Sequence, residues 1–299
     1  MVRAGQYATY VVNGAGSVWT AGYRSYGQLG DEVFSSSKYD TPVRAPSLNN
    51  IATLRQSTTL ESFGTCVVVV SNAGNVYYWP ALTMSGSGVG SSTYDVEQLS
   101  GFSAPVVAAD VGYANKYHHI CALVQSGAIE CAGYNVYGAL GDGTRTNRAT
   151  PVAVVADVGS PTILNATRVA AADNTNCASN ATHVWCWGLN SDGQVGDGTK
   201  SSRQDGAVSV VGSGSFSGDV KDLQCGGTHC CMLLDNGGMA CWGDNTYGKL
   251  GDGSTTDQTS PTAVSGINGS VVMIEVGDAT TCALTTSGDL YCWVRRRPS

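Results

Sequence analysis

Short apolar runs alternate with polar or glycine-containing turns along the whole chain. In six places two such runs flank one turn, and this arrangement is typical of a β-hairpin. The six hairpin segments begin at Tyr10, Cys66, Cys121, Cys177, Cys231 and Cys282. No stretch shows a sustained helical period, so the pattern predicts an all-β protein.

A glycine-rich loop with glycines at the same three offsets follows several of these hairpins. Its four clear copies are AGYRSYGQLGDE from Ala21, AGYNVYGALGDG from Ala132, WGLNSDGQVGDG from Trp187 and WGDNTYGKLGDG from Trp242. Gly133, Gly188 and Gly243 follow one another at equal intervals of 55 residues. Gly22 lies two periods before Gly133, and a degenerate copy near Trp79 falls between them. One period therefore runs through the whole chain.

Each period has room for about four short strands, which is the size of one propeller blade. After the glycine loop come Pro42, Pro151 and Pro261, each beginning a further short strand before the next hairpin. A β-sandwich also uses short strands, but it does not need a repeat of this kind. We therefore expect a single β-propeller domain over residues 1–299. Its approximate repeats are 1–40, 41–95, 96–148, 149–203, 204–258 and 259–299.

Composition and charge narrow the classes of partner. The 299 residues include 39 glycines, only 13% are charged, and the net charge is −7. An acidic chain lacks the clustered Lys and Arg that neutralise a phosphate backbone, so nucleic acid is not an expected partner. The chain has no run of 18 apolar residues, so no membrane span is predicted, and the N-terminus shows no export signal. Eleven cysteines nevertheless favour an extracellular or periplasmic location, where disulfides persist.

The hairpin followed by W-G-x-N-x-x-G-x-x-G-D-G resembles the repeat of the regulator of chromosome condensation family. That resemblance implies a β-propeller, seven-bladed in the best-known members. The Cys-Ala-Leu and Cys-Trp-Gly ends of the hairpins are similar to the bacterial, secreted type of this repeat. Val294 stands where the family has glycine, and the last glycine loop is missing. The six hairpins fit either a six-bladed ring lacking one strand or a fragment of a seven-bladed ring, and we favour the fragment because an unsealed ring exposes a sheet edge.

The cysteines fall into pairs on the two arms of single hairpins, 9 or 10 residues apart. Cross-strand disulfides form where the Cβ atoms approach to roughly 4 Å. The expected pairs are Cys121 with Cys131, Cys177 with Cys186, Cys231 with Cys241 and Cys282 with Cys292. Cys66, Cys225 and Cys230 are left without an assigned partner. The alternative is a zinc site from Cys225, His229, Cys230 and Cys231, but there is no C-x-x-C spacing, so we expect no metal and no cofactor.

The glycine loops and histidines offer little chemistry. A phosphate-binding loop needs Lys-Ser/Thr and a following helix, and a calcium loop needs alternating acids and a later glutamate; neither is complete in CWGLNSDGQVGDG. We expect the glycines at 188, 193, 196 and 198 to provide positive φ or close approach between blades. We expect Asn190 and Asp197 to cap turns. His118, His119, His183 and His229 belong to no recognisable catalytic triad, so structural roles are expected for them.

Tyrosines occupy the variable positions of the repeated loop and predict a ring of aromatic side chains on one rim. They are Tyr23, Tyr26, Tyr134, Tyr137 and Tyr247. Tyrosine loses little rotamer entropy for the area it buries, which suits a protein interface. In the β-lactamase-inhibitory branch that this repeat type resembles, loop aromatics bind the enzyme. The alternative is that these rings pack over neighbouring blades.

The expected function is a non-enzymatic, monomeric module that presents propeller loops to a protein partner, either binding or inhibiting it. A second hypothesis, implied by the family resemblance, is guanine-nucleotide exchange on a small GTPase, against which the cysteines and the acidic charge count. A third is a propeller enzyme, which would need carboxylates and histidines clustered at the axis.

Overall fold

The computed structural model describes most of the chain. The described residues are 2–4, 8–23, 29–31, 38–48, 50–56, 66–79, 96–114, 117–157, 163, 165–212, 214 and 216–294.

These residues form 23 β-strands and one short 3₁₀ turn, η2 (Thr246–Gly248). The first three blades contain β1 (Val2–Ala4), β2 (Ala8–Val12), β3 (Val18–Tyr23), β4 (Lys38–Arg44), β5 (Ile51–Gln56), β6 (Val67–Ser71), β7 (Val76–Trp79), β8 (Glu97–Leu99), β9 (Val106–Ala114), β10 (Tyr117–Val124), β11 (Ile129–Gly133) and β12 (Arg148–Ala153). The last three contain β13 (Arg168–Ala171), β14 (Thr175–Ser179), β15 (Val184–Leu189), β16 (Arg203–Ser209), β17 (Val220–Cys225), β18 (His229–Leu234), β19 (Met239–Gly243), β20 (Gln258–Ala263), β21 (Val271–Val276), β22 (Thr280–Thr285) and β23 (Leu290–Val294).

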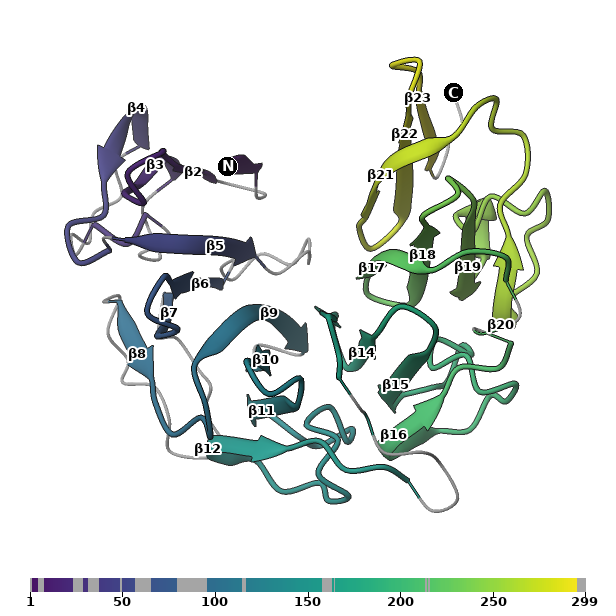
Figure 1. Ribbon diagram of the computed structural model, residues 1–299, viewed down its shortest axis with the longest axis horizontal. Helices are drawn as coiled ribbons and strands as arrows, with labels where there is room; N and C mark the ends of the chain where they lie inside the picture. Colours follow the sequence, from purple (N-terminus) through teal and green to yellow (C-terminus); the bar gives the residue numbers. More distant parts are fainter. Residues whose placement is uncertain are drawn as a thin grey trace.

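The strands form six antiparallel sheets in which sequence neighbours pair, five of four described strands and the last of three. The sheets follow one another around a common centre with the first strand of each sheet innermost, and the first and last sheets face each other across an opening (Figure 1). The predicted β-propeller is confirmed. No helix among the described residues is long and apolar enough to cross a membrane.

The blades are shifted relative to the repeats expected from the sequence. The sequence predicts the third repeat at 96–148, whereas its sheet spans β9 to β12, residues 106–153. The difference arises because the strand containing Pro151 pairs back onto the preceding hairpin, with Val152 opposite Cys131. The glycine loop therefore lies inside a blade, between its third and fourth strands.

The hydrophobic cores lie between blades. Among the described residues there are five clusters of buried side chains, and each combines residues of two successive sheets. Trp79, Trp187 and Trp242, at the ends of their hairpins, are fully buried in three of these clusters. Because a four-stranded sheet covers neither of its faces alone, each blade depends on its neighbours for burial of apolar surface.

The third glycine of the repeated loop allows this packing. Gly196 has a φ of 77°, and a Cβ atom there would lie 2.8 Å from Cδ1 of Trp242 in the next blade. The Trp242 Nε1 atom donates a hydrogen bond to the carbonyl oxygen of Gln194, at 2.9 Å. Gly141 contacts Trp187 in the same way one blade earlier. The expected combination of positive φ and close approach between blades is present at these glycines.

Candidate functional site

The repeated loops run from the third to the fourth strand of each blade, and together they form one end of the propeller. The described loops are 134–147, 190–202 and 244–257, and we call this end the loop face. The opposite end carries the tight hairpin turns between second and third strands, such as 125–128 and 235–238.

An asparagine and an aspartate hold each loop in shape. Asn190 is fully buried; its side chain donates to Oδ1 of Asp197 at 3.1 Å and accepts from the amide of Val195 at 3.0 Å. The same pairs recur in the other loops as Asn135 with Asp142 and Asn245 with Asp252. The turn-capping role expected for Asn190 and Asp197 is what the structure shows.

The aspartate carboxylates of these loops accept hydrogen bonds from nearby residues of the same blade. Burial raises the pKa of Asp197, but hydrogen bonds from Thr199, Gln204 and Asn190 outweigh burial and lower the pKa below its ordinary value. Asp142 and Asp252 have their pKa values lowered in the same way. These aspartates therefore stabilise the loops in their ionised form.

Blade 3 carries a small aromatic cluster on the loop face. Tyr134 stacks on Tyr117, with ring centroids 4.8 Å apart and planes 19° from parallel. Burial, followed by the proximity of Tyr137 and Tyr117, raises the pKa of Tyr134. All three rings are half-buried. Tyr117 was not expected from the sequence, because it precedes the hairpin and lies outside the repeated loop.

Tyr247 is the most exposed of the predicted loop tyrosines whose side chains are described. It is 53% exposed, and its φ of 75° is in the left-handed region, which a bulky residue rarely adopts. Tyr137, in the corresponding position of blade 3, is not among the residues of positive φ. Tyr247 lies on blade 5, so the loop of blade 4 separates it from the blade 3 cluster. Tyr26 and the side chain of Tyr23 lie outside the described residues.

Five disulfides stabilise hairpins. Cys121–Cys131, Cys177–Cys186, Cys231–Cys241 and Cys282–Cys292 each join residues directly opposite on the second and third strands. These are the four pairs that the sequence spacing indicated. A fifth disulfide, Cys225–Cys230, joins the first and second strands of blade 5.

Cys66 is the single cysteine without a disulfide, and it is buried. Burial raises the pKa of its thiol to about 12, so the sulfur is neutral and unreactive at physiological pH.

Buried histidines connect neighbouring blades. Nε2 of His119 lies 2.9 Å from Oδ1 of Asn176, and Nε2 of His229 lies 2.8 Å from Oγ1 of Thr281. Burial lowers the pKa of His118 and His229 to about 3 and that of His119 to about 4, so all three are neutral. His183 lies in a hairpin turn, where its ring stacks on Trp185.

The structure does not bring together all four residues of the alternative zinc site, Cys225, His229, Cys230 and Cys231. His229 faces Thr281, and Cys231 is bonded to Cys241 in the core between blades 5 and 6. Among the described residues, one group of three potential metal ligands has its donor atoms within 4.8 Å of one another: Cys177, Cys225 and Cys230. All three sulfurs are in disulfides.

An ion pair that the sequence did not suggest lies beside the loop face of blade 5. Nζ of Lys249 lies 2.6 Å from Asp244 and 2.7 Å from Oγ1 of Thr228, and it reaches the backbone oxygen of Asp278 in blade 6 at 3.3 Å. Burial raises the pKa of Asp244, but the hydrogen bonds from Lys249 and Thr246 together outweigh burial and hold that pKa well below its usual range. The pair joins two blades at their loop ends.

Comparison with known proteins places these repeats in a family. Two models of the regulator of chromosome condensation (RCC1) repeat match residues 236–284 and 220–249. The human E3 ubiquitin-protein ligase HERC2 is 27% identical over 296 residues, which is 97% of this chain and 6% of HERC2. The ultraviolet-B receptor UVR8 of Arabidopsis thaliana is 32% identical over 178 residues, 58% of this chain and 39% of UVR8. The chain thus spans well under half the length of these relatives.

Solved propellers share the fold. A crystal structure of human WBSCR16 superposes with a TM-score of 0.76 at 21% identity, covering 98% of this chain and 77% of that one. The yeast RCC1 protein bound to Kap60 superposes with a TM-score of 0.75 at 16% identity, covering 98% and 69%. At these identities the likeness concerns the fold alone.

Proposed function

We propose, from the premise that this chain belongs to the RCC1-like repeat family of β-propellers, that it is a protein-binding module whose loop face contacts the partner. It binds or inhibits that partner without covalent chemistry of its own. The fold does not identify a partner, so the proposal depends on the loop face itself.

The observation that carries the proposal is the conformation of Tyr247. A left-handed backbone is unfavourable for tyrosine by about 1–2 kcal/mol. The same residue leaves half of its side chain exposed, so burial of the ring within this chain offsets only part of that unfavourable energy. A strained, exposed aromatic residue on a rigid loop is expected where a binding surface is prepared before the partner arrives.

The blade 3 cluster supports the same proposal. Stacking with Tyr117 fixes the ring of Tyr134, so little side-chain entropy is lost when a partner covers it. The bonded aspartates of the blade 3 and blade 5 loops keep the backbone of these loops in place. Rigid aromatic anchors on a fixed scaffold are typical of protein interfaces.

A capture experiment tests the proposal. The immobilised chain is compared with a variant carrying Tyr134→Ala, Tyr137→Ala and Tyr247→Ala, each incubated with the extract or medium of the source organism. We expect recovery of bound proteins to fall about 10-fold or more in the variant, as for loss of interface hot spots. The matched control is Leu290→Ala, which removes a 68% exposed side chain beside a hairpin turn at the opposite end. Equal recovery by the chain and the triple variant would contradict the proposal.

The identity of the captured protein separates the remaining alternatives. Capture of a small GTPase whose nucleotide release is accelerated by the chain would favour the exchange-factor hypothesis. The name of HERC2 describes a ligase, but the match covers 6% of that protein and does not carry ligase activity over to this chain.

We also propose that the protein functions in an oxidising compartment, because ten of its eleven cysteines are in disulfides. The test is alkylation of the protein from its native source, denatured without reductant. One labelled thiol per chain, at Cys66, is expected. Labelling of most or all of the eleven cysteines would overturn the proposal.

A further inference from the structure

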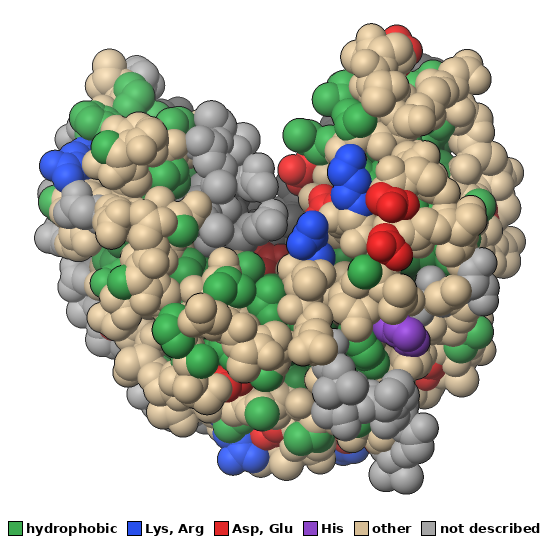
Figure 2. Space-filling view, in the orientation of Figure 1, with side chains coloured by type: hydrophobic (Ala, Val, Ile, Leu, Met, Phe, Trp, Pro, Cys, Tyr) green, Lys and Arg blue, Asp and Glu red, His purple; other side chains and the backbone are tan. Residues whose placement is uncertain are grey.

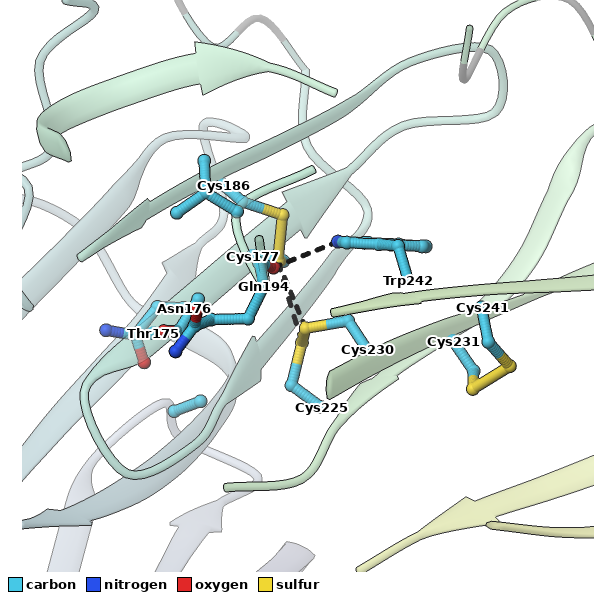
Figure 3. Close-up of a disulfide and its surroundings, with 12 residues drawn as sticks. Thr175, Asn176, Cys177, Cys186, Gln194, Cys225, Cys230, Cys231, Cys241 and Trp242 are labelled. Atoms are coloured by element: carbon cyan, nitrogen blue, oxygen red, sulfur yellow. Dashed lines mark hydrogen bonds between the residues drawn. A yellow bond between two sulfur atoms is a disulfide. The ribbon is translucent and has the colours of Figure 1, made fainter. Parts of the chain in front are cut away.

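Two disulfides meet in the core between blades 4 and 5. Cys177–Cys186 belongs to blade 4 and Cys225–Cys230 to blade 5, and the two face one another in Figure 3. The Sγ atom of Cys177 lies 3.5 Å from Sγ of Cys225 and 3.7 Å from Sγ of Cys230. These distances are close to van der Waals contact between sulfur atoms, so nothing lies between the two bonds.

The strand pattern explains why the sulfurs meet. Successive residues of a strand face opposite sides of a sheet. In β18, Cys231 therefore faces blade 6 and its core, whereas Cys230 faces blade 4. Cys225 lies directly opposite Cys230 on β17 and faces the same way. The additional pair of blade 5 is thereby placed against the hairpin pair of blade 4.

The arrangement is confined to this one interface among the described residues. No other three cysteine sulfurs come within 4.8 Å of one another there. Cys121–Cys131 lies in the core between blades 3 and 4 without a second disulfide. The blade 3 pair therefore provides a matched reference with the same strand register and no sulfur neighbour.

We infer that these four cysteines form a thiol–disulfide exchange site, at which a small thiol converts two disulfides within blades into one disulfide between blades. Exchange requires a thiolate to attack a neighbouring disulfide sulfur. In the structure Cys177 already lies in contact with both sulfurs of the other disulfide.

The reaction balances with a single external thiolate. That thiolate attacks the sulfur of Cys225, which at 5% is the most exposed residue of the four, and forms a mixed disulfide with it. Cys230 leaves as a thiolate and attacks Cys177. Cys186 then leaves and takes up a proton from solvent. The products are the mixed disulfide on Cys225, a disulfide between Cys177 and Cys230, and a thiol at Cys186.

The new bond changes which parts of the chain are tied together. The original disulfides span 9 and 5 residues, whereas a bond from Cys177 to Cys225 or Cys230 spans 48 or 53 residues. Closing a longer loop restricts the unfolded chain more. The exchange thus replaces disulfides within single blades with a disulfide that links two blades.

A variant with an unpaired Cys177 tests the inference without any external thiol. In Cys186→Ser, the thiolate of Cys177 attacks Cys225 or Cys230 directly and releases the other. The folded variant is held at pH 8, quenched with acid, alkylated and digested with trypsin without reduction. Cleavage after Arg168, Lys200, Lys221 and Lys249 places Cys177 in peptide 169–200 and all four blade 5 cysteines in peptide 222–249.

We expect the two peptides to be joined, with fragmentation assigning the bond to Cys225 or Cys230 and one of these two left alkylated. The matched control is Cys131→Ser, which leaves Cys121 unpaired. There we expect an alkylated Cys121 and separate peptides. An alkylated Cys177 with an intact Cys225–Cys230 bond, or a bond from Cys177 to Cys231 or Cys241, would overturn the inference.

The unsubstituted protein provides a second measurement that does not depend on folding of a variant. It is treated with glutathione at a concentration too low to reduce the other disulfides, then quenched and digested in the same way. We expect the joined peptides 169–200 and 222–249 to appear together with alkylated Cys186. Reduction of Cys225–Cys230 to two alkylated thiols, with the peptides separate, would contradict the inference.

Discussion

Tyr247 combines exposure and backbone strain on one side chain, and this combination separates it from the other loop tyrosines. The bonded asparagine and the positive-φ glycine are common to both loops, as Asn245 and Gly248 in blade 5 and as Asn135 and Gly138 in blade 3. Only Tyr247 nevertheless has a left-handed backbone, so the strain is specific to the blade 5 loop.

Glycine at this position should relieve the strain. We expect Tyr247→Gly to raise the free energy of unfolding by about 1 kcal/mol, because glycine adopts positive φ without steric penalty. The same change is expected to weaken capture of the partner. The control Tyr137→Gly replaces a residue outside the left-handed region and should lower the free energy of unfolding. The measurement is the free energy of unfolding of both variants in urea. A lower value for Tyr247→Gly than for the unsubstituted protein would contradict the expectation, because it would show that the ring packs more strongly than its exposure indicates.

At the scale of the strand and loop, packing of a glycine against the tryptophan of the next blade is what joins the repeats. The cores lie between blades, so the free energy of unfolding depends on these contacts more than on any single sheet. The buried histidines add hydrogen bonds across the same interfaces.

Two glycines allow the packing effect to be separated from the backbone effect. Gly196 and Gly212 both have positive φ, 77° and 72°, but only Gly196 has a neighbour within 4 Å of a built Cβ atom. We expect Gly212→Ala to lower the free energy of unfolding by about 1 kcal/mol, the conformational penalty alone. Gly196→Ala should lower it by about 3 kcal/mol or more, because Trp242 must also move. Equal losses in denaturant unfolding would contradict this role for Gly196.

Burial of His229 predicts a pH dependence with a defined sign. Its pKa is about 3 in the folded protein and 6.5 for the unperturbed group. Between these values the unfolded chain binds a proton that the folded protein does not, so the free energy of unfolding falls as pH drops below 6.5. At pH 5 this amounts to about 2 kcal/mol. We expect His229→Gln to reduce the stability difference between pH 7 and pH 5 by that amount in urea titrations; an unchanged difference would refute the assignment.

The features that repeat along the chain could be predicted from the sequence, whereas those that occur once could not. The 55-residue period, the hairpins and the glycine roles recur, so each copy supports the others. The contact between Cys177 and Cys225 depends on which face of β17 packs against blade 4. The repeat pattern of the sequence does not indicate that face. Tyr117 and the Lys249–Asp244 pair lie in positions that vary between blades, so their partners became visible only from the three-dimensional packing.

For the molecule as a whole, the two ends of the propeller are unlike. The loop face has long, internally bonded loops with tyrosines between the bonded positions. The opposite end has four-residue turns closed by backbone hydrogen bonds, such as those from Gly127 to Val124 and from Gly237 to Leu234. Figure 2 shows charged side chains in a few separate groups on the face it presents, with the first and last blades standing apart. A binding surface made of loops from successive blades requires the ring geometry but no catalytic centre.

Hydrogen–deuterium exchange of the chain, free and bound to its captured partner, tests the loop-face proposal most directly. We predict slower exchange on binding in segments 134–147 and 244–257, with the hairpin turns 125–128 and 235–238 unchanged. Protection of those turns without protection of the loops would contradict the proposal and place the partner at the other end of the propeller.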